Sequence, residues 1–245
     1  MNRFVAIFIV LLGVALISIA ALPMMNGAEP TDKEGGSIYS VLVSFDHHTY
    51  AVNVQLYDNY LEGYHNSTIP RFMSTFAYYR YITPDDPTIK DIATQLLLYG
   101  SDMSDLDKVS LANAFVHTAV TYKNDEGALL PEYLQYPAET LERGLGDCED
   151  HAILLTSILR AMGYDAVTVT MLGQQHVAVG VALEGGEHSF TWFGKEYCYV
   201  ESTSGAYAGY QGISGSPFVD DMPWAILWII IVLLSFGFLF WTLRG

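Results

Sequence analysis

The chain has 245 residues, of which 51% are hydrophobic and 16% are charged, and its formal net charge is −16. This apolar content excludes an intrinsically disordered acidic chain, because disordered chains lack the aliphatic and aromatic residues that build a core. The negative charge argues against a nucleic-acid partner, since the phosphate backbone would be repelled. Two cysteines are too few for a disulfide framework or for a cysteine-only zinc site.

Two uncharged apolar segments lie near the ends of the chain. They are Phe4–Leu22, which follows Arg3, and Trp224–Leu243, which precedes Arg244. Each is long enough to cross about 30 Å of hydrocarbon as a helix. We therefore expect a C-terminal transmembrane helix. For the N-terminal segment two readings stay open, a membrane anchor or a signal segment that is cleaved after small residues such as Ala20.

The charges predict the orientation of the chain in a lipid bilayer. Arg3 and Arg244 are the bases that flank the apolar segments, and the positive-inside rule places both termini in the cytoplasm. All 27 acids and nine of the 11 bases lie between the segments, which gives that region a net charge of 9 − 27 = −18. We expect this region to be extracytoplasmic. The triplet Asn66-Ser67-Thr68 would then be available for glycosylation.

Composition divides the chain into an ordered series of parts. Residues 1–23 and 223–245 form the two membrane-directed ends. The region between them starts with a linker rich in glycine, proline and charge and ends with a tail rich in glycine and serine. From the N-terminal side its parts are a linker (24–37), a hairpin and Tyr-rich subdomain (38–87), a main domain (88–205) and the tail (206–222).

The expected elements of the main region are helices followed by strands. A hairpin is predicted from Ile38–Phe45 and Tyr50–Leu56. Helical spacing of apolar residues predicts helices over Thr88–Tyr99, Asp105–Tyr122 and Cys148–Met162, with a polar loop over 123–146. Strands are predicted over 166–172, 176–183, 189–193 and 197–200. Helices that precede an antiparallel sheet indicate an α+β fold.

Cys148 lies at the predicted first turn of a strong helix. Asp147 is positioned to cap that helix with its side chain. The positive end of the helix favours the thiolate over the thiol, which makes a cysteine nucleophilic near neutral pH. The alternative is a small buried core residue, because cysteine is among the residue types most often buried.

A thiolate nucleophile needs a base, and two of the seven histidines are candidates. His176 heads a strand with clean alternation, in which Val177 and Val179 face one side and His176 and Ala178 face the other. His151 lies one turn along the helix of Cys148 and points back towards it. His176 is the preferred base, and His151 is the competitor.

An acid at the end of an aromatic strand would orient the imidazole. Glu201 shares its face of the strand with Tyr197 and Tyr199, whereas Cys198 points to the other face. This alternation disfavours a disulfide between Cys148 and Cys198, although an exported protein with two cysteines makes that bridge the alternative.

These stretches resemble the transglutaminase-like, papain-type superfamily. The similar motifs are residues 139–150, 152–164, 175–181 and 199–203. The chain looks like the membrane-anchored archaeal transglutaminase-like proteins and is similar to the bacterial transglutaminase-like cysteine proteinases. The resemblance implies a Cys-bearing helix packed on an antiparallel sheet, with Cys148 as nucleophile, His176 as general base and acid, and Glu201 as orienting acid. It implies no required cofactor.

The chain departs from the family pattern at three points. Many members have Asp where this chain has Glu201, and the aromatic residue that often follows the histidine is replaced by Val177. The donor that would complete an oxyanion hole is not assigned, and its candidates are Gln135, Tyr136 and His117.

Three acids surround the nucleophile, namely Asp147, Glu149 and Asp150. Their negative charge disfavours a thiolate, but helical spacing turns the side chains of Glu149 and Asp150 away from Cys148. Acids at a helix start complement the helix dipole, which is the preferred explanation. The alternative is a Ca²⁺ site, because calcium prefers clustered carboxylates and the similar bacterial proteinases use acids beside their cysteine in this way.

Three functional classes follow from this sequence. The first is an extracytoplasmic cysteine hydrolase, a protease or amidase that cleaves amide bonds of a protein or peptide substrate through a thioester. If an amine captured the thioester, the enzyme would instead be a cross-linking acyltransferase. The second is a catalytically inactive binding module for cell-surface protein or peptide. The third, a structural subunit of a membrane complex, has little support because polar intramembrane residues are scarce.

Overall fold

The computed structural model describes residues 35–69, 78–124, 133–172, 176–209, 216–219 and 234. The chain divides into two compact units, residues 30–221 and residues 1–29 with 222–245. The fold described below is that of residues 30–221. Apart from residue 234, both predicted membrane segments lie outside the described residues. Within the described part of the chain, no helix combines the length and apolar character needed to cross a bilayer.

The N-terminal hairpin pairs β1 (Ile38–Phe45) with β2 (His48–Gln55) in antiparallel register along both strands. Asp46 and His47 form the turn with φ of 45° and 63°. Positive φ at both positions is the geometry whose twist matches that of the flanking strands. The predicted hairpin is confirmed, and β2 begins two residues earlier than predicted because the turn has only two residues.

The outer edge of β2 is closed by side chains of α3 (Pro87–Tyr99). The Gln95 amide accepts a hydrogen bond from the backbone N–H of Asn53 and donates one to its carbonyl, each at 2.8 Å. The Tyr99 hydroxyl donates to the carbonyl of Ala51 at 2.7 Å. These backbone groups of β2 are therefore satisfied without a further strand.

Helix α3 begins at residues that satisfy its first backbone N–H groups. Pro87 opens α3, and the Asp86 carboxylate accepts from the N–H groups of Thr88 and Ile89. The other helices before the sheet are α2 (Asp58–His65), a 3₁₀ turn η2 (Tyr78–Arg80), α4 (Asp105–Ala119), α5 (Pro137–Arg143) and α6 (Cys148–Ala161).

Two sequence predictions are wrong in this region. The helix predicted to reach Tyr122 ends at Ala119, and Thr121–Tyr122 form the short strand β3, which pairs in parallel with β4 (Leu145–Gly146). A β-branched and an aromatic residue favour the extended conformation here. The predicted loop over 123–146 contains α5 and β4, and α5 is only seven residues long, too short for a clear helical period.

The C-terminal sheet is antiparallel throughout, with strand order β7-β8-β6-β5-β9. Its strands are β5 (Ala166–Leu172), β6 (His176–Val181), β7 (Ser189–Trp192), β8 (Lys195–Val200) and β9 (Ser216–Val219). The predicted tail over residues 206–222 therefore contributes β9, an edge strand paired with β5. The predicted α+β class with an antiparallel sheet is confirmed.

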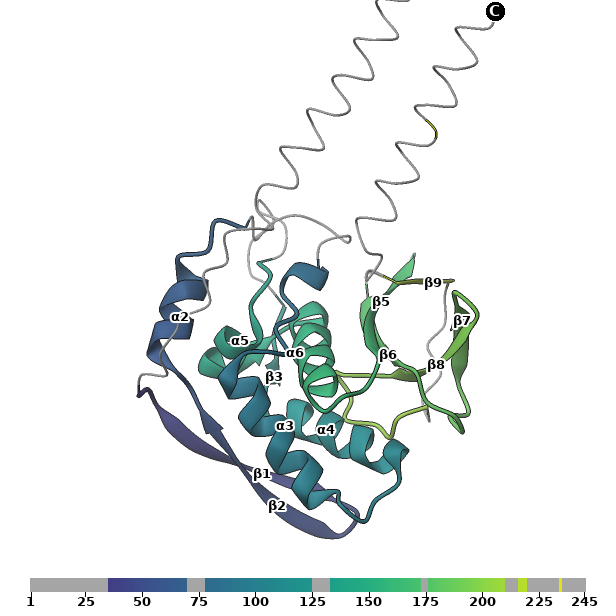
Figure 1. The fold of residues 1–245 in the computed structure, drawn as a ribbon, viewed down its shortest axis with the longest axis horizontal. Coiled ribbons are helices and arrows are strands. Elements are labelled where there is room, and N and C mark those ends of the chain that lie inside the picture. Colours follow the sequence, from purple (N-terminus) through teal and green to yellow (C-terminus); the bar gives the residue numbers. More distant parts are fainter. Residues whose placement is uncertain are drawn as a thin grey trace, which may run out of the picture. The chain divides into compact units, whose positions relative to one another are not determined.

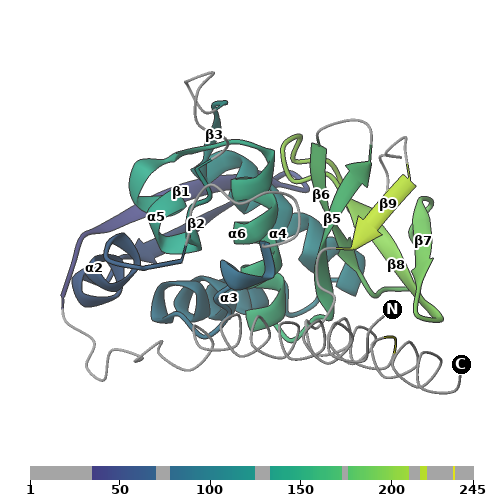
Figure 2. The same cartoon turned by 90° about the horizontal axis from the view of Figure 1, so that it is seen from above.

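Helix α6 occupies the centre of the fold, among α3, α4 and α5 and against β5 and β6 (Figures 1 and 2). From Ala152 to Leu159 all its side chains are buried. A helix that is apolar around most of its circumference is suited to such a site. The opposite face of the sheet carries a second apolar cluster that includes Tyr197 and Tyr199. Apolar side chains therefore line both faces of the sheet.

Candidate active site

Cys148 begins α6, and the chain reaches it through β4. The thiol is buried, with 6% of the residue exposed. Asp147 occupies the N-cap position in an extended conformation, but its side chain makes no capping hydrogen bond, so the predicted carboxylate cap is wrong. Its backbone carbonyl instead accepts hydrogen bonds from the backbone and ring of His151.

The Cys148 thiol donates a hydrogen bond to Oε2 of Glu149 at 2.9 Å. The prediction that helical spacing turns the Glu149 side chain away from Cys148 is wrong, because the long side chain brings its carboxylate back to the thiol. Burial raises the pKa of the Cys148 thiol, and the charge and hydrogen bond of Glu149 raise it further. The raised pKa favours the thiol form of Cys148 over the thiolate.

His176 and Glu201 form the closest charged pair of the site. Nε2 of His176 lies 2.7 Å from Oε2 of Glu201, with the two side chains 25% and 8% exposed. A hydrogen bond to Glu201 raises the pKa of His176, although burial opposes it. Burial acts to raise the pKa of Glu201, but hydrogen bonds from His176 and Thr203 outweigh it and the net shift is downward. Each partner favours the charged form of the other.

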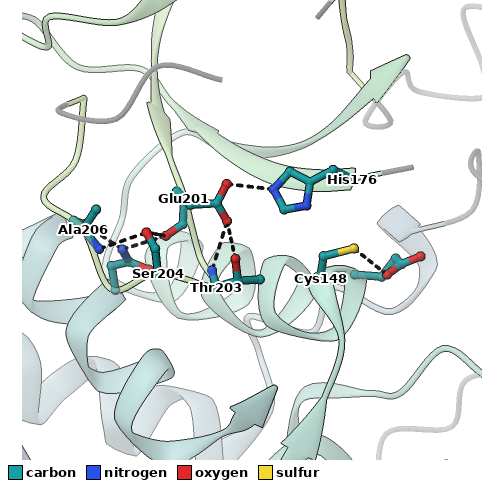
Figure 3. A network of polar contacts seen from close by, with 8 residues as sticks. Cys148, His176, Glu201, Thr203, Ser204 and Ala206 are labelled. Atoms are coloured by element: carbon teal, nitrogen blue, oxygen red, sulfur yellow. Dashed lines mark hydrogen bonds and ion pairs between the residues drawn. The ribbon is translucent and has the colours of Figure 1, made fainter. Parts of the chain in front are cut away.

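Glu201 is held from the side opposite His176 (Figure 3). Oε1 accepts from the Thr203 hydroxyl at 2.6 Å and from its backbone N–H at 3.1 Å. The Asn113 side chain on α4 donates to the carbonyls of Glu201 and Ala206, at 3.1 and 2.8 Å. The sequence analysis predicted neither the Thr203 nor the Asn113 contact. Thr203 could have been found, because it lies two residues after Glu201, whereas no sequence pattern connects Asn113 with Glu201.

The imidazole and the thiol lie next to each other at the start of β6. The backbone N–H of Val177, the residue after His176, makes a hydrogen bond to the Cys148 sulfur that lowers the thiol pKa against the effect of burial. Figure 3 shows the His176 ring turned so that one nitrogen contacts Glu201 and the other is on the side of Cys148. The three residues predicted from sequence are thus brought together, with the imidazole between the carboxylate and the sulfur.

His151, the competing base, is occupied elsewhere. Its Nδ1 lies 2.7 Å from the carbonyl of Asp147 and its Nε2 lies 3.3 Å from the carbonyl of Val120. Both ring nitrogens therefore face backbone acceptors. Burial lowers the pKa of His151, and the ring joins the start of α6 to the end of α4 through these two carbonyls.

The alternative of a disulfide is excluded, because Cys148 and Cys198 are both free thiols. The sulfur of Cys198 contacts the carbonyl of Leu183 at 3.1 Å. Cys198 is therefore part of the packing of β8, an interior strand of the sheet, and does not contact Cys148.

The three acids around Cys148 point to different partners. Glu149 accepts from the thiol, whereas Asp150 accepts from the backbone N–H of Gln135 at 2.9 Å and also from its side-chain amide. Among the described residues, no group of three or more histidine, cysteine or carboxylate side chains is arranged to hold a metal ion. The calcium site considered for Asp147, Glu149 and Asp150 gains no support from this geometry.

The three candidates for an oxyanion donor also have other surroundings. Gln135 binds Asp150, Tyr136 stacks on Tyr64 with ring centroids 4.3 Å apart, and His117 is exposed on α4.

Sequence reasoning did not consider Tyr122. Its backbone pairs with Gly146, two residues before Cys148, and the residue is 49% exposed. Burial raises the pKa of Tyr122, and the charges of Cys148 and the nearby carboxylates raise it further. Tyr122 is therefore close enough to Cys148 to feel its charge.

Comparison with known proteins identifies the part of the chain that carries these residues. No curated protein matches significantly. A crystal structure from Parabacteroides distasonis, described as a "putative protease", is 12% identical with a TM-score of 0.37; the similarity covers 77% of this chain and 41% of the other. Residues 92–202 match the family model of the transglutaminase-like superfamily. This segment contains Cys148, His176 and Glu201, and it is similar to the transglutaminase-like superfamily.

Proposed function

We propose that the chain is a membrane-anchored, extracytoplasmic cysteine hydrolase, a protease or amidase that cleaves amide bonds of a protein or peptide. The observation that carries the proposal is the 2.7 Å contact between Nε2 of His176 and Glu201, which leaves the other ring nitrogen on the side of Cys148. An imidazole held by a carboxylate beside a thiol is the arrangement that nucleophilic catalysis needs. Membrane anchoring is proposed from the two apolar end segments of the sequence.

The reaction would pass through a thioester. Nδ1 of His176 takes the thiol proton, and the Cys148 sulfur attacks the amide carbonyl. The imidazolium then gives that proton to the departing amine as the C–N bond breaks. Water, deprotonated by the same imidazole, hydrolyses the thioester and releases the carboxylic acid. Capture of the thioester by an amine instead of water would form a cross-link.

Two groups of the site would assist these steps. Backbone N–H groups at the start of α6 and the Tyr122 hydroxyl would stabilise the oxyanion of the tetrahedral intermediate; the pairing of Tyr122 with Gly146, two residues before Cys148, supports this role. Glu149 has the opposite effect before substrate binds, because its carboxylate accepts a hydrogen bond from the thiol and so favours the protonated form. Substrate binding would have to turn the thiol from Glu149 to His176 before attack.

The raised pKa of Cys148 favours a second candidate function, a binding module for cell-surface protein or peptide without turnover. Alkylation by iodoacetamide separates the two. In the full chain, purified in detergent, the hydrolase predicts labelling of Cys148 near neutral pH that is lost in His176→Ala and retained in the control His188→Ala, an exposed histidine. Labelling should be read by peptide mass spectrometry, because Cys198 is also a thiol. Equal labelling in the wild type and His176→Ala would contradict the hydrolase.

A further inference from the structure

Asp147, the residue before the nucleophile, has a buried carboxylate that the fold leaves without a partner. The residue is 9% exposed. Its side chain does not cap α6, and among the described residues it makes no other hydrogen bond and no ion pair. A carboxylate that has left water without a partner costs free energy. The contacts of the fold itself do not explain why an acid occupies this position.

The two acids that follow Cys148 differ from Asp147 in this respect. Glu149 accepts from the Cys148 thiol, and Asp150 accepts from the backbone N–H of Gln135, each at 2.9 Å. Both acids lie in the first turn of α6, where negative charge complements the helix dipole. The helix therefore has acids for this purpose without Asp147.

The carboxylate of Asp147 remains open to solvent. Some described residues, such as Asn113, Gln135 and Ser202, have a side-chain polar atom that is sealed from solvent and has no hydrogen-bond partner. The oxygens of Asp147 are not among these sealed atoms. A ligand that enters from solvent can therefore reach this carboxylate.

The charge of Asp147 acts on the groups that would carry out the reaction. Burial is the main cause that raises the pKa of Cys148 and of Tyr122, and the charge of Asp147 adds to both shifts. Tyr122 is half-exposed and pairs with Gly146, the neighbour of Asp147. A substrate bound at the sulfur would therefore lie within range of the Asp147 charge.

The chemistry of the missing partner follows from this environment. The chain has 27 acids and 11 bases, so its field attracts cations and repels anions. A protonated primary amine supplies both the positive charge and the N–H donors that a carboxylate accepts. Peptides carry such an amine at the N-terminus and in lysine-like side chains.

We propose that Asp147 is a specificity-determining residue that binds a protonated primary amine of the peptide, close to the scissile amide. This inference rests on the proposed function, because it names the kind of peptide that the Cys148 site accepts. The ammonium group donates to the carboxylate and replaces the water that burial removes. The amine belongs either to the N-terminus of the peptide or to a lysine-like side chain, and the test separates the two sources.

The test compares two thiol reagents that differ in charge. Aminoethyl methanethiosulfonate carries an ammonium group on a short chain, whereas methyl methanethiosulfonate is neutral. Both react with the full chain in detergent and EGTA, and modification of Cys148 is followed by peptide mass spectrometry. Because both reagents need the same thiolate, the ratio of their rates does not depend on the pKa of the thiol.

The expected result is a change of this ratio in one variant. Asp147→Asn should lower the rate of the charged reagent relative to the neutral one by roughly tenfold, because a close charge pair out of water is lost. The control Asp102→Asn removes the same charge from an exposed turn and should change the ratio by less than about twofold. An unchanged ratio in Asp147→Asn would overturn the inference.

Two small amines identify the source of the ammonium group. Glycinamide presents an α-amino group beside an amide, and aminohexanamide presents the amine at the end of an alkyl chain. The amine that slows the neutral reagent in the wild type, but not in Asp147→Asn, identifies the source. Protection by calcium chloride and by neither amine would overturn the inference.

The neutral reagent also keeps the two proposals distinct. Equal rates of this reagent in the wild type and His176→Ala would contradict the hydrolase, and a lowered ratio in Asp147→Asn would then assign amine recognition to the binding module. As a second measurement, Asp147→Asn removes an unpartnered charge and should unfold at or above the wild-type temperature. A lower unfolding temperature would show that Asp147 serves the fold and would overturn the inference.

Discussion

The reactivity of Cys148 depends on the balance between Glu149 and the Val177 N–H. Because the negative charge and hydrogen bond of Glu149 raise the pKa of the thiol, removing the charge should lower it. We predict that Glu149→Gln shifts the pH profile of iodoacetamide labelling downward by roughly one unit. The control is Glu196→Gln, an exposed acid on β8. An unchanged profile in Glu149→Gln would show that burial alone sets the thiol pKa.

Tyr122 is expected to act on the oxyanion and not on the thiol. Acylation of Cys148 by p-nitrophenyl acetate passes through a tetrahedral oxyanion, whereas alkylation by iodoacetamide does not. We predict that Tyr122→Phe slows acylation by about 100-fold, as loss of an oxyanion donor does, and leaves alkylation unchanged. Tyr133→Phe, exposed outside the site, is the control. An equal loss in both reactions would indicate a structural role for Tyr122.

The His176–Glu201 pair should stabilise the fold within a defined pH range. The pKa of Glu201 is lowered from 4.5, so its contribution is present above pH 4.5 and is lost as the pH falls through the folded-state value. The pKa of His176 is raised from 6.5, so its contribution is present below pH 6.5 and is lost as the pH rises through its folded-state value. Both contributions are present between pH 4.5 and pH 6.5, so thermal melts should show the largest destabilisation by His176→Ala in that range. A difference that does not vary with pH would contradict the ion pair.

At the scale of elements, stability should depend most on α6. Leu155 is fully buried in this helix, and truncation of such a side chain removes apolar contacts and leaves a cavity. We predict that Leu155→Ala lowers the free energy of unfolding by about 2–5 kcal/mol in urea titrations. The matched control Leu98→Ala, at a side chain that is 71% exposed on α3, should change it by less than about 0.5 kcal/mol. Similar losses in both variants would argue against α6 as the centre of the core.

Sequence patterns predicted those elements that are long enough to show a hydrophobic period and whose ends are marked by turn or capping residues. The hairpin, α3, α6 and strands β5 to β8 have such patterns, and Cys148, His176 and Glu201 could be found because each begins or follows one of them. Helix α5 was missed because seven residues are too few to show a helical period, and β9 was missed because it lies in a tail rich in glycine and serine.

Contacts that depend on the path of a long side chain or on distant pairing could not be predicted in the same way. Helical spacing gives the direction of the Glu149 Cβ but not of its carboxylate, which returns to the Cys148 thiol. Tyr122 reaches the site only because a two-residue strand pairs with Gly146, 24 residues further along the chain. The Asn113 contact with the carbonyl of Glu201 spans 88 residues, and no local pattern records it.

At the scale of the whole molecule, the proposed orientation predicts a modification. Asn66 is exposed at the end of α2, so the acceptor residue of the sequon lies on the surface of the domain. The Ser67 hydroxyl contacts the hydroxyl of Tyr136. In cells that glycosylate exported proteins, we predict that Asn66→Gln increases gel mobility while Asn59→Gln, outside any sequon, does not. Identical mobility of the wild type and Asn66→Gln would contradict an extracytoplasmic domain.

The contact between Gln95 and Asn53 has a consequence for how copies of this protein meet. An unsatisfied strand edge invites a strand from another molecule, and that is a common route to aggregation. Here one glutamine amide supplies both the donor and the acceptor that such a strand would offer, and Tyr99 adds a third bond. These backbone groups of the β2 edge are therefore already hydrogen-bonded within the molecule, so copies of the protein at high concentration do not pair strand to strand along β2.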